Sequence, residues 1–311
     1  MPMTTTDTKP THPRSRTGSR QRPGFLLQTR DLGILRTVIQ LRVLSTPQIA
    51  GLYFPTESGE VSSACRSRLR LLTQAGYLER HFQLQQPTDG RLPHLFMPAA
   101  EGVALVASEL GAEEQQLDWQ PSYNSVSWPF LAHQLALNDV YVAFRKAAAP
   151  GGWMIGHWVD DRLLKRTHTA TITLEERGKS EKVGVVPDAY MSLELQRPPW
   201  QLHFFIERDR GTMPATAGKP LGHSWHRRIL AYNAAFDEGL FERQYGTSRI
   251  RVLTVTDGRS RLKTLKATTE KAGGRGRYWF ATVQALEDGN PYTRKIWYRA
   301  GEDKKTALLQ D

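Results

Sequence analysis

The chain has 311 residues, enough for two domains that each bury a core of their own. Its formal net charge of +11 favours an anionic partner such as nucleic acid. No apolar run approaches the roughly 18 residues that a membrane span needs, and a single cysteine, Cys65, excludes a disulfide framework and a cysteine-based zinc finger. We therefore expect a cytoplasmic protein that binds nucleic acid and no membrane.

Residues 1–25 form the first predicted segment, a basic tail. Five Lys and Arg side chains stand there against one Asp, and four prolines accompany few apolar residues. Such a segment cannot bury enough surface to fold. We expect it to be disordered, and its composition leaves open whether it adds phosphate contacts to bound DNA.

Residues 26–111 are predicted to form a winged helix-turn-helix domain. Apolar residues recur there at helical spacing, Thr46-Pro47 is a helix start, Gly76 a helix stop, and Asp89-Gly90 a hairpin turn. The expected elements, in chain order, are helices at 31–44, from 46, and at 60–75, strands at 77–84 and 91–97, and a helix at 101–110. The alternative is a small helical domain with a solvated basic face.

The third of these helices is the candidate DNA reader. One face carries an apolar stripe that includes Cys65 and Leu69, and polar residues fall on another face. An arginine of such a helix can bond guanine O6 and N7 in the major groove. The candidate DNA-binding residues of this domain are Ser62, Arg66, Arg70 and Gln74 on the helix and Arg91 on the hairpin.

A polar linker is expected over 112–127, an α/β domain over 128–300, and a short tail over 301–311. The expected elements of the domain are a helix at 131–148, strands at 153–158, 185–195 and 201–207, a helix at 223–236, a strand at 250–255, a helix at 260–272 and a strand at 278–283, with a polar insertion at 165–182. This order predicts a mixed sheet with helices on both faces. Residues 222–300 hold fifteen Lys and Arg against seven Asp and Glu, and Arg261 and Lys263 are the candidate phosphate contacts.

An acidic cluster is predicted at the ends of two strands of this domain. Strand alternation places Glu207 and Asp209 on one face, and Asp188 follows a proline on the preceding strand. Three such carboxylates could hold Mg²⁺ or Mn²⁺ and act on phosphodiesters. The alternative is a strand that leaves the core and enters a solvated, charged loop.

The element order and three short motifs resemble known proteins. The motifs are His133-Gln-Leu-Ala-Leu-Asn138-Asp139, Val186-Pro-Asp188-Ala and Ile206-Glu-Arg-Asp-Arg-Gly211-Thr. The fold implied is an α/β (α+β) protein, a winged helix followed by a PD-(D/E)xK nuclease-like domain, and over residues 30–285 the chain is similar to the replication-relaxation family. The resemblance implies DNA binding in the replication, maintenance or transfer of a plasmid or other mobile element.

The chain departs from the nuclease pattern at the third signature position. That position is normally a lysine, which stabilises the attacking water or the developing charge, and here it is Asp209. Lys219 in the following loop, or Arg227 on the following helix, is then the candidate to supply the cation. The candidate catalytic set is Asp188, Glu207, Asp209 and Lys219, of which the three carboxylates are the candidate metal ligands.

Three functions remain open from the sequence. The chain could be a non-catalytic DNA-binding or regulatory protein, a Mg²⁺-dependent endonuclease or nickase targeted by its winged helix, or a scaffold for other replication proteins. The absence of a GxxxxGK[ST] loop argues against ATP use. The sequence does not decide between a monomer and a homodimer.

Overall fold

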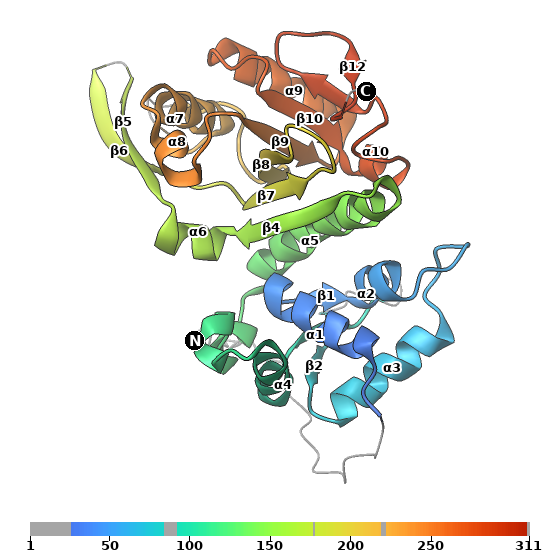
Figure 1. The fold of residues 1–311 in the computed structure, drawn as a ribbon. Helices are drawn as coiled ribbons and strands as arrows, with labels where there is room; N and C mark the ends of the chain where they lie inside the picture. The colour runs from blue at the N-terminus through green and yellow to red at the C-terminus, as the bar shows by residue number, and fades with distance from the viewer. Residues whose placement is uncertain (1–25, 84–91, 177, 219–221, 310–311) are drawn as a thin grey trace, which may run out of the picture. The chain divides into compact units, whose positions relative to one another are not determined.

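The computed structural model describes residues 26–83, 92–176, 178–218 and 222–309. The chain divides into two compact units, Met1–Leu131 and Ala132–Asp311 (Figure 1). Two candidate site residues, Arg91 and Lys219, lie outside the described residues, as do the predicted tail at 1–25 and the predicted hairpin turn. Among the described residues, no helix combines the length and the apolar composition that crossing a bilayer requires.

The first unit contains a helical layer beside a small antiparallel sheet. Its elements are α1 (Thr29–Leu41), β1 (Leu44–Ser45), α2 (Thr46–Tyr53), α3 (Ser63–Gln74), β2 (Leu78–His81), β3 (Leu95–Pro98) and α4 (Ala100–Leu110). The strand order is β1-β3-β2, with β3 antiparallel to both neighbours. Three helices followed by two paired strands is the order that the sequence predicts for this unit. The predicted α/β class is confirmed by the seven-stranded mixed sheet of the second unit.

Local capping explains where the two central helices begin. Ser45, rather than the expected Thr46, caps α2: its hydroxyl accepts from Gln48 N at 3.4 Å while Gln48 Oε1 accepts from Ser45 N at 2.9 Å. The hydroxyl of Ser62 accepts from Cys65 N at 3.2 Å and so caps α3. Cys65, Leu69 and Leu72 of the predicted apolar stripe are buried, as their helical spacing predicts, whereas Val61 precedes the helix and is half-buried.

The second unit is built around a seven-stranded mixed sheet. Its main elements are α5 (Trp128–Ala148), β4 (Met154–Asp160), α6 (Asp161–Thr167), β5 (Ala170–Glu176), β6 (Lys179–Val185), β7 (Ala189–Glu194), β8 (Gln201–Asp209), α7 (Trp225–Asp237), α8 (Leu240–Tyr245), β9 (Ile250–Thr256), α9 (Arg259–Lys271), β10 (Tyr278–Thr282), α10 (Val283–Glu287), β11 (Trp297–Arg299) and β12 (Lys305–Thr306). The sheet order is β12-β11-β10-β9-β8-β7-β4, parallel only across β8-β9-β10. The succession α5-β4-β7-β8-α7-β9 is that of the predicted nuclease-like domain.

Helices cover both faces of this sheet (Figure 1). On one face Phe205 of β8 contacts the rings of Tyr232 on α7 and Phe241 on α8. Trp158 of β4 points to the opposite face, because its register partner on β7 is one residue from the partner of Phe205, and it contacts Tyr141 of α5. The carboxyl ends of β8 and β9 therefore emerge between helices, where charged side chains can be held.

Three segments differ from the sequence prediction. The polar insertion at 165–182 contains most of a hairpin, β5–β6, whose apolar face packs on α7. The expected tail at 301–311 contains β12, which pairs with β11, and Leu308, two residues after that strand, is buried. The expected linker at 112–127 belongs to the first unit and contains two short 3-10 turns.

Candidate functional sites

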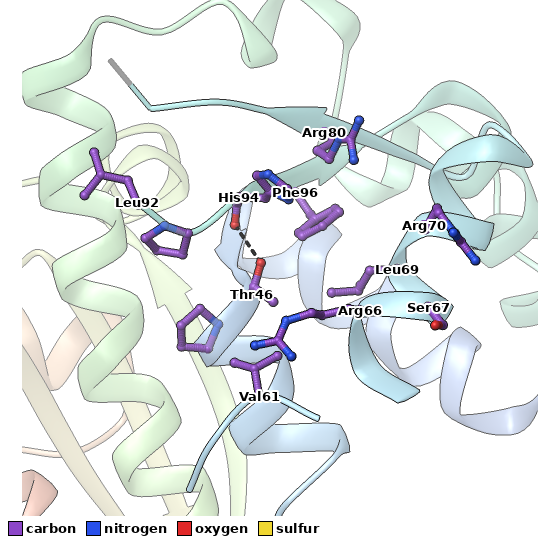
Figure 2. Close-up of a pocket in the computed structure, with 12 residues that line it drawn as sticks. Thr46, Val61, Arg66, Ser67, Leu69, Arg70, Arg80, Leu92, His94 and Phe96 are labelled. Atoms are coloured by element: carbon purple, nitrogen blue, oxygen red, sulfur yellow. Dashed lines mark hydrogen bonds between the residues drawn. The ribbon is translucent and has the colours of Figure 1, made fainter. Parts of the chain in front are cut away.

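A pocket of about 560 Å³ opens on the first unit, between α3, the start of α2 and the β2–β3 hairpin (Figure 2). The lining residues come from all three elements: Thr46, Pro47, Val61, Arg66, Ser67, Leu69, Arg70, Arg80, Leu92, Pro93, His94 and Phe96. The start of α2 is tied to the hairpin, because both the backbone N and the hydroxyl of Thr46 donate to the carbonyl oxygen of His94, at 2.9 and 3.2 Å. The pocket is therefore a feature of the assembled first unit.

Charge and apolar surface are separated within this pocket. Arg66 and Arg70 on α3 and Arg80 on β2 are exposed, while Leu69 and Phe96 form a buried apolar floor. Among the described lining residues there is no Asp or Glu. Such a surface attracts an anion with some apolar surface of its own.

The structure separates the polar residues of α3 into two groups. Arg66 and Arg70 line the pocket, and Gln74 is exposed further along the helix. Arg68 instead pairs with the buried Asp31 of α1, with its Nε 2.7 Å from Asp31 Oδ1. The hydroxyl of Ser62, predicted to contact DNA, is used as the helix cap described above. Arg68 therefore joins α3 to α1, whereas Arg66 and Arg70, each two residues away from it, are exposed to solvent.

In the second unit, two of the three predicted carboxylates come together. Asp188 stands just before β7 and accepts a hydrogen bond from the backbone N of Arg208 at 2.8 Å. Glu207 lies on β8, next to the residue that pairs with Ala189, and only 3% of it is exposed. His133, from the first of the three motifs, lies with Nε2 3.6 Å from Asp188 Oδ2. The three motifs therefore meet at one end of the sheet.

A guanidinium occupies the space between these carboxylates. Nη2 of Arg228 on α7 is 2.7 Å from Glu207 Oε1 and 3.6 Å from Asp188 Oδ1, and it donates to the carbonyl oxygen of Val186 at 2.9 Å. The hydroxyl of Tyr232, one turn further along α7, donates to the same Glu207 oxygen. Arg228 is thus the cation of this cluster.

The third carboxylate, Asp209, belongs to a different pair. Arg261 on α9 donates to both of its oxygens, at 2.9 and 2.7 Å, and the Thr256 hydroxyl donates at 2.9 Å. Arg261, predicted as a phosphate contact, is therefore used to fix α9 to the end of β8. Lys263, the other predicted contact of this helix, is exposed.

These contacts do not fit the predicted metal site. Among the described residues, no group of three or more His, Cys, Asp or Glu side chains is placed to hold a metal ion. Asp188 and Glu207 share Arg228, while Asp209 is held by Arg261. A divalent ion bound between Asp188 and Glu207 would have to displace the partly buried guanidinium of Arg228, which already offsets part of their charge.

Sequence reasoning selected the wrong residue of α7. Arg227, proposed as a substitute for the missing lysine, pairs with Glu181 of β6 at 2.8 Å. Arg228 lies three residues after the buried Trp225 and four before the buried Tyr232, so it lies on the inward face of the helix. The helical phase of these two aromatic residues is the signal that could have identified Arg228.

The environment shifts the pKa values of this cluster in different directions. Burial raises the pKa of Glu207 to about 7, although the charge of Arg228 acts against the shift. Burial also disfavours the Asp188 carboxylate, but the nearby His133 and the charge of Arg228 outweigh it and lower its pKa. The nearby Asp188 carboxylate raises the pKa of His133. At neutral pH the cluster therefore holds a charged Asp188 beside a partly protonated Glu207.

We expect the Glu207→Gln variant to change how stability depends on pH. A carboxyl whose pKa is near 4.5 in the unfolded chain and about 7 in the folded one binds its proton more tightly when folded, so its contribution to stability falls as pH rises from about 4.5 to 7. The free energy of unfolding of Glu207→Gln should then equal that of wild type near pH 5 and exceed it near pH 8, by on the order of 3 kcal/mol at most. Urea unfolding at both pH values measures this difference. A variant less stable than wild type at pH 8 would show that the ionised Glu207 stabilises the fold.

Together these features define a class: a unit of four helices and a three-stranded antiparallel sheet, followed by an α/β unit with a seven-stranded mixed sheet whose acidic cluster is neutralised by arginine. The replication-relaxation family model matches residues 35–249, and the chain belongs to the replication-relaxation family. A comparison with curated proteins finds no match.

A solved structure of the restriction endonuclease FokI shows a weak similarity, with 14% sequence identity and a TM-score of 0.24. The similarity covers 84% of this chain and 42% of the FokI chain, so this chain spans less than half of that protein. At this level of similarity nothing about activity follows.

Proposed function

We propose that this protein binds double-stranded DNA through the pocket face of its winged helix and acts, without cutting the DNA, in the replication, maintenance or transfer of a plasmid or other mobile element. The observation that carries the proposal is that Arg66, Arg70 and Arg80 line one pocket, whose described lining residues include no Asp or Glu. Membership of the replication-relaxation family supports the proposed role in the replication, maintenance or transfer of a mobile element.

The geometry of this face suits a duplex. The major groove of B-DNA, about 12 Å wide, admits one α-helix, and α3 presents two exposed arginines one turn apart, at positions i and i+4. Arg80 on the hairpin and the start of α2 flank the helix and could contact the phosphates beside that groove. Phosphate contacts would position α3, and Arg66 and Arg70 would contact the bases.

The acidic cluster supports binding rather than cleavage. In a metal-dependent nuclease, carboxylates hold an ion that neutralises the charge developing on the phosphate. Here Glu207 and Asp188 instead pair with Arg228. The signature lysine is replaced by Asp209, which Arg261 neutralises in turn. These ion pairs give the carboxylates a structural role: Glu207 joins α7 to the sheet, and Asp209 joins α9 to it.

The DNA-binding proposal predicts a strong dependence on salt. DNA releases bound counterions when Lys and Arg side chains neutralise its phosphates. The logarithm of the association constant for a duplex should therefore fall linearly with the logarithm of salt concentration, with a slope of about −0.9 per phosphate contact. Fluorescence anisotropy with a labelled duplex measures the slope, and deleting residues 1–25 should reduce it while leaving sequence preference nearly unchanged. Binding that ignores salt, or no binding at low salt, would contradict the proposal.

The absence of cutting is tested separately. Wild-type protein incubated with supercoiled plasmid and Mg²⁺ or Mn²⁺ should leave the plasmid supercoiled. Nicking by wild type that disappears in Glu207→Gln, with DNA binding retained, would instead identify a metal-dependent nuclease.

A further inference from the structure

Phe82 is an aromatic side chain that remains 60% exposed just after β2. Arg80, two residues earlier, lies on the same side of the strand because side chains alternate, and its guanidinium carbon is 5.1 Å from the centre of the Phe82 ring. The His94 ring meets the Phe82 ring edge-on, with 5.0 Å between centroids. Arg80 and His94 both line the pocket, so the exposed ring contacts two of its lining residues.

The hairpin holds this ring in place. Arg80 pairs in register with Phe96 on β3, and Nε2 of Gln83, the residue after Phe82, donates to the carbonyl oxygen of Pro93 at 3.0 Å. Single exposed apolar side chains are common on protein surfaces, so exposure alone means little. The distinguishing feature is an aromatic ring in contact with Arg80 and His94, two residues that line the same pocket as Arg66 and Arg70.

We propose that Phe82 stacks on a nucleobase that has left its pair, while the neighbouring arginines hold the phosphates of the same strand. This inference rests on the proposed DNA-binding function and specifies its preferred substrate, a duplex that contains a short unpaired stretch. In a closed duplex both faces of each base are covered by its neighbours, so the ring has no apolar face to contact. An unpaired base offers that face, and stacking on it is tolerant of sequence.

The arrangement of charges agrees with this substrate. Base–aromatic stacking sites for single strands combine a positively charged groove with a ring on which a base can lie. Here the groove is the pocket, and the guanidinium of Arg80 lies against Phe82, where its attraction to the ring helps keep the ring and the charge together. The hairpin would therefore bind the opened strand beside the duplex held by α3.

The test compares two DNAs with the full chain. A labelled 30-base-pair duplex and the same duplex with four mismatched central pairs are titrated at one salt concentration. Wild type should bind the mismatched DNA about tenfold more tightly, Phe82→Ala should lose that preference, and Phe82→Trp should keep it. A 2-aminopurine placed among the mismatched bases should be quenched by wild type and not by Phe82→Ala.

Control variants separate this inference from the proposed function. Leu110→Ala, at another exposed apolar side chain of the same unit, should change neither affinity. Circular dichroism confirms that each variant is folded. The stacking proposal is overturned if wild type binds both DNAs with equal affinity, or if Phe82→Ala lowers the affinity for both DNAs by the same factor. Either result leaves the duplex-binding proposal intact. Failure of wild type to bind either DNA at low salt would overturn the proposed function as well.

Discussion

Replacing Arg228 with methionine is expected to lower the free energy of unfolding by about 3–5 kcal/mol, because it leaves two neighbouring carboxyl groups without their shared cation. Arg228 contacts both Glu207 and Asp188 and donates to a backbone carbonyl. Methionine keeps much of the side-chain volume, so the loss reports mainly on charge and hydrogen bonding. Urea unfolding at pH 8, where Glu207 is mostly ionised, measures it.

The adjacent residue provides a matched control. Arg227→Met removes the same charge one position away, but its partner Glu181 is half exposed, so we expect a loss of less than about 1 kcal/mol. The double variant Glu207→Gln/Arg228→Met should recover part of the stability lost in Arg228→Met, since the two residues are directly coupled. Manganese should raise the melting temperature of Arg228→Met and leave wild type unchanged. Equal losses for Arg227→Met and Arg228→Met would refute the view that Arg228 neutralises this cluster.

Removing the two arginines of α3 is expected to have the largest effect on DNA binding. Arg66→Ala or Arg70→Ala should each cost about 1–3 kcal/mol on a site selected from random sequences and relax the preference at one or two positions. The physical reason is that a guanidinium bonding a guanine edge distinguishes that base from the others. Anisotropy titrations against the selected site and its single-base variants measure both effects.

Two control substitutions show whether α3 reads sequence. Lys263 is exposed on α9. If it contacts phosphates, Lys263→Ala should weaken binding to all DNA sequences about equally. Arg36→Ala removes an exposed charge from α1, a helix that contributes no lining residue to the pocket, and should change binding little. If the substitutions at Arg66 and Arg70 weaken all sequences equally, α3 is not the reader.

The family and the order of the main helices and strands were predictable from the sequence, because they depend on local patterns. The apolar stripe of α3, its stop at Gly76 and the buried strand Val252–Val255 each follow from the spacing of residues within one element. The hairpin at 170–185 was missed, although Ile172 and Leu174 alternate with polar residues, because polar residues dominate the segment. The edge strand β12 was missed because its short sequence becomes a strand only by pairing with β11.

The sequence by itself determined that Glu207 and Asp209 share a face of one strand and that Arg66 and Arg70 share a face of one helix, since these relations are set by the periods of the backbone. Only the tertiary structure decided which cation meets which carboxylate: Arg228 for Glu207, and Arg261 for Asp209. It also decided that Arg80 of the hairpin, which contacts Phe82, lines the same pocket as the arginines of α3. The reason is that partners from different elements depend on helix phase, strand register and packing distance, which no local pattern encodes.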